Sequence, residues 1–143
     1  METARDLSLG QYQDLAEFRR QIRRFLHFSE ATAKDNGFEP KQHQLLLALC
    51  GMPSDVRPTI GELATRLFIQ HHSAVELVNR LESTGAVIRQ PATEDRREVL
   101  VTLTPVGKAA LRRLSLAHRE ELERTGPELA RALNAVLRHA GVK

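Results

Sequence analysis

The chain has 143 residues, a length that allows one domain with a buried core but not two independent ones. With 41% hydrophobic and 27% charged residues it has the composition of an ordinary soluble globular protein, and its net charge of +3 is compatible with a polyanionic partner without demanding one. Only 4% of the residues are aromatic and none is tryptophan, which argues against a stacking surface for single-stranded nucleic acid.

The N-terminal third of the chain predicts two helices separated by a glycine stop. Apolar residues recur every three or four positions from about Ser8 to Lys34, which predicts one long amphipathic helix. Asn36-Gly37 then ends it, because glycine suits the left-handed position after a helix. A leucine-rich helix is expected from Pro40 to Cys50, followed by a loop over residues 54–58.

Two short helices are expected next, joined by a tight connection. Thr59 and Glu62 have the spacing of a capping box, in which each side chain bonds the backbone near the other residue. The first helix is predicted over 61–67, and the second from about His71 to Ser83, with one apolar and one polar face. This arrangement is typical of a helix-turn-helix.

A β-hairpin is predicted after Gly85, where the hydrophobic period changes to 2. Residues 87–90 and 99–103 are short, β-branched and alternating, as expected of two paired strands. Residues 91–97 between them are polar and charged, and form the expected tip. The fold class predicted is therefore mainly α with a small β-hairpin.

The C-terminal segment predicts two further helices. Thr104-Pro105 has the residues expected at a helix start, with Thr104 as the cap, and Gly126-Pro127 is expected to break that helix before a last one. The terminal helices carry apolar stripes that the small middle module cannot fully cover. A self-complementary homodimer would bury them, with packing inside one chain as the alternative.

Three stretches in this order and spacing resemble the MarR family of bacterial regulators, over essentially the whole chain. They are Gly61-Glu-Leu-Ala-Thr-Arg-Leu67, Val78-Asn-Arg-Leu-Glu-Ser-Thr-Gly85, and Asp95-Arg-Arg-Glu-Val-Leu-Val-Thr-Leu-Thr-Pro-Val-Gly107. The last contains Asp-x-Arg, an aliphatic strand and Leu-Thr-x-x-Gly, a combination characteristic of the family.

The resemblance implies the domain organisation and the partners. It implies one MarR-like domain over 1–143, with a winged helix-turn-helix at about 40–104 and dimerisation helices at about 8–36 and 105–143. It also implies a homodimer that binds palindromic double-stranded DNA as a transcriptional regulator, often a repressor released by a small ligand.

The expected recognition helix departs from the family at its start. Gln70 stands where Ser or Thr is common, and its longer side chain is a poor cap, so we expect Ser73 to cap locally instead. Val75 and Glu76 stand where Arg or Thr often faces the bases. A carboxylate near phosphates is unfavourable unless it accepts from a cytosine amino group or is paired, so we expect an operator unlike those of typical members.

The helix over 71–83 is expected to enter the major groove. Base edges would be contacted from its first turns and phosphates from positions further along or on the preceding helix; the residues are His71, His72, Ser73, Glu76, Asn79, Arg80, Gly61 and Arg66. Arg80 has an alternative role, in which it braces the hairpin by pairing with an acidic residue such as Asp95.

The wing, residues 91–98, is expected to reach the adjacent minor groove. Arg97 is the predicted inserting residue, because its guanidinium is planar and always charged and narrow A/T tracts concentrate negative potential. Asp95 would orient Arg97, and Arg96 would contact phosphate or stay solvated.

No enzyme is predicted. The sequence lacks a phosphate-binding glycine loop, a serine nucleophile elbow and paired carboxylates beside a base. His72 and Glu76, one turn apart beside His71, could suggest a metal site, but two ligands do not make a closed one. We therefore expect neither a metal nor a cofactor.

A small anionic aromatic ligand is implied only by the resemblance. Polar candidates for holding it between the first, second and fifth helices are Arg19, Arg23, His27 and His43. Each of these residues also has an ordinary structural or solvated role as an alternative.

Cys50, the only cysteine, allows no intramolecular disulfide and no cysteine-rich zinc site. It could sense oxidants, as in some relatives of the family, but its leucine-rich surroundings favour a small buried side chain. A second alternative is a winged-helix interaction module that binds no DNA. The sequence shows no signal pattern and no apolar run of roughly 18 residues, so we expect a cytoplasmic protein without a membrane partner.

Overall fold

The computed structural model describes residues 6–95 and 97–139, and these residues form two compact units. The helical unit combines the chain up to Ala31 with the chain from Ala117 onward. The central unit runs from Thr32 to Leu116 and contains the candidate site.

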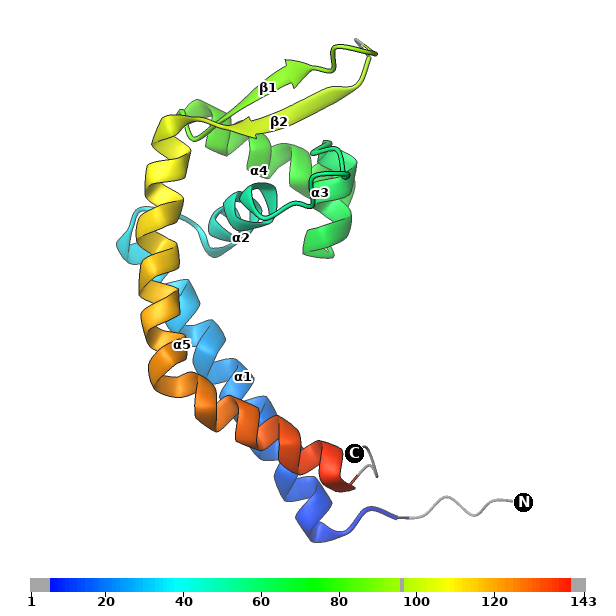
Figure 1. The fold of residues 1–143 in the computed structure, drawn as a ribbon, viewed down its shortest axis with the longest axis vertical. Helices are drawn as coiled ribbons and strands as arrows, with labels where there is room; N and C mark the ends of the chain where they lie inside the picture. The colour runs from blue at the N-terminus through cyan, green and yellow to red at the C-terminus, as the bar shows by residue number, and fades with distance from the viewer. Residues whose placement is uncertain (1–5, 96, 140–143) are drawn as a thin grey trace, which may run out of the picture. The chain divides into compact units, whose positions relative to one another are not determined.

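The order of elements confirms the predicted mainly α fold with one hairpin (Figure 1). Along the chain they are α1 (Leu9–Asp35), α2 (Pro40–Cys50), α3 (Ile60–Leu67), α4 (His71–Ser83), β1 (Val87–Pro91), β2 (Val99–Leu103) and α5 (Pro105–His139). Every boundary before residue 105 lies within one residue of its predicted position, because glycine, proline and capping signals mark these boundaries locally.

The predicted break at Gly126-Pro127 is wrong, because α5 continues through it as one helix of 35 residues. A proline inside a helix removes one backbone donor and costs about 3 kcal/mol, but it does not prevent a helix that packs along its length. The turn before the proline is supported by the Thr125 hydroxyl, which donates to the Glu121 carbonyl at 2.9 Å.

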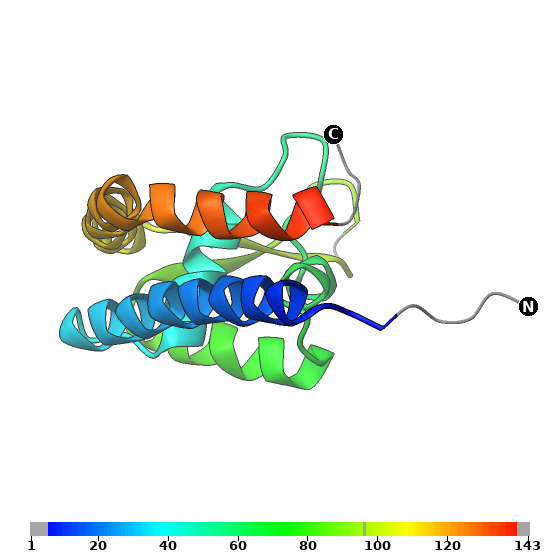
Figure 2. The ribbon, with the colours of Figure 1, turned by 90° about the horizontal axis from the view of Figure 1, so that it is seen from below.

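Within the helical unit, α1 and the C-terminal part of α5 run antiparallel (Figure 2). Arg24 donates to Glu128 across the pair at 2.8 Å. His118 is buried, its Nε2 lies 2.8 Å from the Ser29 hydroxyl, and its ring meets that of Phe28 edge-on at 5.5 Å. These contacts join the two helices although their residues are about a hundred positions apart in sequence.

The core of the central unit forms where the apolar faces of three helices meet the hairpin. Its fully buried large side chains come from α2, α3, α4 and both strands: Leu45, Leu46, Leu63, Val78, Leu81, Val87 and Val101. Leu111 of α5 joins the same cluster. The core fixes α3 and α4 against each other and leaves the opposite face of α4 exposed.

The hairpin is antiparallel, with Val87 opposite Leu103 and Pro91 opposite Val99. The segment before α3 pairs with the free side of β2 through an isolated bridge: the Val101 backbone N–H donates to the Pro58 carbonyl at 2.9 Å, and Thr59 bridges to Leu100. The hairpin is therefore attached at its side as well as at its ends.

The end of the hairpin is joined to α5 through a contact that only glycine permits. The Thr104 hydroxyl caps α5 as predicted, accepting from the Gly107 N–H at 3.1 Å. A Cβ at Gly107 would lie 2.0 Å from the Ala86 carbonyl oxygen, far inside van der Waals contact. This explains the glycine in the Leu-Thr-x-x-Gly pattern.

The capping box predicted at the start of α3 is half present. The Thr59 hydroxyl accepts from the Glu62 N–H at 3.1 Å, but the Glu62 carboxylate does not reach back. It accepts instead from Arg66 at 3.0 Å, an i,i+4 ion pair that competes with the return bond.

None of the helices in the described part of the chain is both long and apolar enough to cross a membrane.

Candidate nucleic-acid interface

Helix α4 presents a polar face opposite its buried one. Ala74, Leu77, Val78 and Leu81 are buried, whereas the predicted contact residues His71, His72, Glu76, Asn79 and Arg80 are all exposed and Ser73 is half-buried. Among the described residues, none pairs with His72, Glu76 or Arg80 through a hydrogen bond or an ion pair between side chains. These groups are free to meet an external partner.

The start of α4 is uncapped by side chains. Gln70 occupies the N-cap position and makes no side-chain capping bond, as its length predicts. The local capping expected of Ser73 is wrong, since the described hydrogen bonds include none from its side chain. The first backbone N–H groups of α4 therefore point outward without a side-chain acceptor.

Arg89 of β1 joins the hairpin to α4, a contact that no local sequence pattern predicts. Its Nη1 donates to Glu82 Oε1 at 2.9 Å, and its Nη2 donates to Asn79 Oδ1 at 2.6 Å. Its backbone N–H donates to Glu82 Oε2 at 3.1 Å. Asn79, predicted as a contact residue, is thus also part of the link between α4 and β1.

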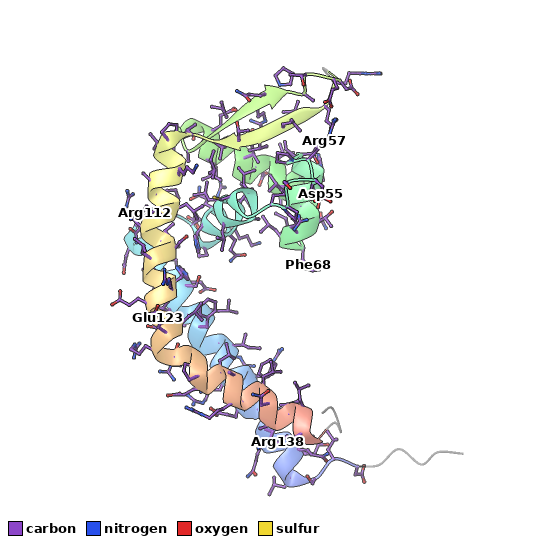
Figure 3. The ribbon with its side chains drawn as sticks, in the orientation of Figure 1. Asp55, Arg57, Phe68, Arg112, Glu123 and Arg138 are labelled. Atoms are coloured by element: carbon purple, nitrogen blue, oxygen red, sulfur yellow. The ribbon has the colours of Figure 1, made fainter. Side chains whose placement is uncertain are left out.

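Helix α3 carries the two remaining candidates of the helix-turn-helix. Gly61 and Arg66 are both exposed, and Arg66 is held by Glu62 one turn earlier. Between α3 and α4 the chain turns at Phe68, which has a left-handed backbone (φ 56°, ψ 41°) and a side chain that is 96% exposed (Figure 3).

The wing brings Asp95 and Arg97 together. The Asp95 carboxylate accepts from the Arg97 backbone N–H at 3.0 Å and lies 3.6 Å from its Nε. The Arg97 side chain is 95% exposed, so this contact orients its backbone without covering its charge. Asp95 pairs with Arg97 and not with Arg80. Arg96 lies outside the described residues.

Arg57, in the loop between α2 and α3, makes a second contact with the hairpin that was not predicted from the sequence (Figure 3). Its guanidinium donates to Glu98 at 2.5 Å and also to Glu94, so one cation neutralises two carboxylates of the wing. The hydrogen bond to Glu98, followed by the charges of both carboxylates, raises the pKa of Arg57 above its ordinary value. No local pattern signals this contact, because its partners lie 37 and 41 positions away.

Cys50 is exposed, so the expected burial of its side chain is wrong. It lies on the side of α2 that faces away from the core, where Leu47, three residues earlier, is also 50% exposed. With Lys108, Leu111, Arg112 and neighbours it lines an open, mostly apolar hollow of about 420 Å³.

The other ligand candidates belong to different units. Arg19, Arg23 and His27 are exposed on the part of α1 in the helical unit, and His43 is buried on α2 in the central unit. As for metals, residues 6–95 and 97–139 contain no group of three or more His, Cys, Asp or Glu side chains that could hold an ion.

A helix-turn-helix followed by a hairpin, with the exposed face of the second helix beside it, defines a winged helix-turn-helix protein. Residues 36–98 match the model of the MarR family. A putative transcriptional regulatory protein for the hcr operon of Thauera aromatica is 29% identical over 99 residues, which are 69% of this chain but only 58% of that relative.

Solved structures of MarR regulators share the fold. AbsC from Streptomyces coelicolor, a MarR family transcriptional regulator, superposes with a TM-score of 0.73 at 21% identity, over 96% of this chain and 98% of its own. The repressor CouR bound to a 23-mer DNA duplex gives 0.68 at 24% identity, over 96% and 99%. CouR from Rhodococcus jostii RHA1 bound to p-coumaroyl-CoA gives 0.69 at 20% identity, over 82% and 81%. The match over residues 36–98 agrees with the resemblance to the MarR family that the motifs indicated.

Proposed function

We propose that this protein is a transcriptional regulator that binds specific sequences of double-stranded DNA, and that it is a repressor released by a small ligand. The observation that carries the proposal is the pairing, on one MarR-family unit, of an exposed polar α4 face with a wing whose Arg97 is 95% exposed. The DNA complex of CouR, which has the same fold, supports it. In this role the protein is not an enzyme and acts in the cytoplasm.

In the proposed complex α4 enters the major groove and the wing reaches the minor groove. His71, His72, Ser73 and Glu76 face base edges, because they lie in the first turns of the helix that a groove admits. The wing residues 91–98 place Arg97 in the minor groove, where a guanidinium is favoured by the negative potential. Arg96, in the same wing, is proposed to contact phosphate or to stay solvated.

Phosphates are contacted from the flanks of α4. Arg80 is exposed at its C-terminal end, and Gly61 and Arg66 lie on α3. Arg66 is the weaker cation of the two, because Glu62 already compensates its charge at 3.0 Å.

Dimerisation through the terminal helices gives the protein two identical DNA-binding faces. Several large apolar side chains on these helices stay exposed within the described helical unit: Leu9, Tyr12, Leu15, Leu26, Leu122 and Leu133. Isolated surface leucines are common, but an apolar stripe at helical spacing on two long helices is the surface that a twofold interface buries. A homodimer with residues 8–36 and 105–143 at its interface fits a palindromic operator.

Release by a small anionic aromatic compound is the regulatory part of the proposal. The complex of CouR with p-coumaroyl-CoA shows that a protein of this fold binds an aromatic acyl thioester, which is anionic. Arg19, Arg23, His27 and His43 remain the candidate polar contacts.

Redox sensing through Cys50 is the second candidate, favoured by the exposure of its thiol beside Lys108 and Arg112. Peroxide titration of DNA release separates it from ligand control. Release that is lost in Cys50→Ser supports the thiol, and release that survives the substitution excludes it.

The test of the proposed function is selection of DNA from a random pool by the purified protein. A palindromic motif with half-sites about one helical turn apart is the expected result, because a twofold dimer places its two recognition helices at that spacing. Recovery of no enriched sequence, together with no protection of promoter DNA in footprinting, would favour an interaction module that binds no DNA.

A further inference from the structure

We propose that Arg89 makes Asn79 a one-sided hydrogen-bond donor toward DNA, so that this position of α4 contacts an acceptor atom and not the paired donor and acceptor of adenine. The inference rests on the proposed function, which supplies the DNA. It adds a role for Arg89, a residue of the hairpin that would never itself touch a base.

The orientation of the Asn79 amide follows from the chemistry of its partner. Arg89 Nη2 lies 2.6 Å from the Asn79 side chain, and a guanidinium has only donors. The atom that faces Arg89 must therefore be the carbonyl oxygen, whichever way the amide is turned elsewhere. The Asn79 NH₂ group is then directed away from β1, on a side chain that is exposed.

Arg89 is itself held in place, which keeps the amide from turning. Its other terminal nitrogen donates to Glu82 Oε1 at 2.9 Å, and its backbone N–H donates to the second Glu82 oxygen at 3.1 Å. Hydrogen bonds between ionised groups are the stronger kind, and the Arg89 side chain is only 26% exposed. The contact with Glu82 therefore holds the Arg89 guanidinium in place, and the guanidinium in turn holds the Asn79 amide.

The fixed amide limits what Asn79 can recognise. Asparagine reads adenine by a two-point contact, in which its oxygen accepts from N6 and its nitrogen donates to N7, so both atoms must face the base together. Here Oδ1 faces β1, and turning it outward would break the bond to Arg89. The remaining partners share one chemistry, an acceptor: a phosphate oxygen, O6 of guanine, O4 of thymine, or N7 of either purine, which does not distinguish adenine from guanine.

The decisive variant is Asn79→Asp, measured against operator DNA by fluorescence anisotropy. One carboxylate oxygen keeps the contact with Arg89, while the outward donor becomes an anionic acceptor of the same shape. We expect operator affinity to fall by about tenfold or more, with a thermal midpoint no lower than that of the wild type. Ser83→Asp is the matched control, because it adds the same charge to an exposed position one turn further along and is expected to cost less.

A second variant removes the hydrogen bond that Arg89 donates to Asn79 Oδ1. Arg89→Met leaves the Asn79 amide able to turn, and DNA selection is expected to shift one position of each half-site toward adenine. Glu82→Gln removes the charge but keeps one oxygen that can accept from Arg89, so it weakens the support of the bond to Asn79 without deleting that bond, and the motif is expected to shift less than in Arg89→Met.

DNA selection with the Asn79→Ala variant shows whether the acceptor belongs to a base or to a phosphate. A loss of preference at one base pair identifies an acceptor on a base, and an equal loss on all sequences identifies phosphate; both support the donor. If the wild type binds its operator and Asn79→Asp binds it equally well, or the wild type already prefers adenine through Asn79, the inference is overturned while the proposed function stands. Failure of the wild type to select any DNA overturns the proposed function, and this inference with it.

Discussion

Helix α4 and the wing use their charged residues in opposite ways. Across the described part of α4, the exposed Glu76 and Arg80 make no ion pair, and His72 beside them is equally free. In the wing nearly every described charge is engaged, by Arg57 with two glutamates and by Asp95 with Arg97.

The difference follows from how each element is held together. A helix forms its backbone hydrogen bonds within itself and is stabilised by packing of its buried face. The side chains on its outer face are therefore not needed to hold it in place. A two-stranded hairpin is marginal alone, and this one is held by the bridge to Thr59, by Arg57 and by Arg89. Side chains are therefore free for recognition where the backbone supplies the stability.

The largest expected effect comes from breaking the join that holds the hairpin to α5. In Gly107→Ala the added Cβ would lie 2.0 Å from the Ala86 carbonyl oxygen, so backbone must move. We expect the free energy of unfolding to fall by about 3 kcal/mol, measured by urea denaturation at fixed protein concentration. Gly10→Ala in α1 is the control: its Cβ would lie 3.8 Å from the Ser8 hydroxyl oxygen, an ordinary contact, and a stability equal to or above wild type is expected. Equal losses in both variants would show that the close approach is not the cause.

Arg97→Ala tests the exposed cation in the described part of the wing. Loss of a minor-groove guanidinium is expected to weaken operator binding by about 2 kcal/mol and to flatten the salt dependence by about one counterion. Gel shifts over a series of salt concentrations measure both quantities. Arg119→Ala removes another exposed arginine, in the helical unit, and serves as the control. An unchanged affinity and salt slope in Arg97→Ala would remove this residue from the interface.

Arg57→Ala tests whether pairing inside the wing serves DNA binding. It leaves Glu94 and Glu98 uncompensated on a surface proposed to face phosphates, and we expect operator affinity to fall about fivefold. The double substitution Glu94→Gln and Glu98→Gln in the Arg57→Ala background is expected to restore most of the affinity. Without restoration, the loss would come from hairpin position and not from repulsion.

The smallest effect concerns the turn that leads into α4. Phe68 has φ 56° and is 96% exposed, so its side chain gains no packing for a conformation that L-residues disfavour. Phe68→Gly is expected to raise the free energy of unfolding by about 0.5–1 kcal/mol and to leave operator affinity unchanged. Phe68→Ala keeps the backbone penalty and should gain nothing. A loss of DNA affinity in both would give the Phe68 ring a role at the interface.

The helix boundaries and the exposed face of α4 could be predicted because their signals are local. Gln70 makes no capping bond because its side chain is too long for that position. His72 and Glu76 are exposed because helical periodicity places them opposite Leu77 and Leu81. The same periodicity applied to Leu47 and Cys50 would have placed the thiol outward. The prediction that the Cys50 side chain is buried was wrong because it relied on the neighbouring leucines in sequence and not on the periodicity.

The errors and omissions involve contacts between distant segments. Pro127 has a local free-energy cost inside a helix. Only the packing of a helix of 35 residues explains why the helix forms in spite of that cost. Arg57 and Arg89 find their partners across a loop or another element, at separations that no periodicity encodes. Their pairing depends on the register of the hairpin and the packing of α4, which become known only with the fold.

The bridge between Thr59 and β2 has a consequence for protein engineering. Because the Val101 amide bonds to the Pro58 carbonyl and Thr59 bridges to Leu100, the hairpin is completed by residues more than forty positions earlier in the chain. A chimera that exchanges only residues 87–103 with those of another family member would separate the strands from the edge on which they pair. The transferable module is discontinuous, and a graft of this wing has to carry residues 57–59 with it.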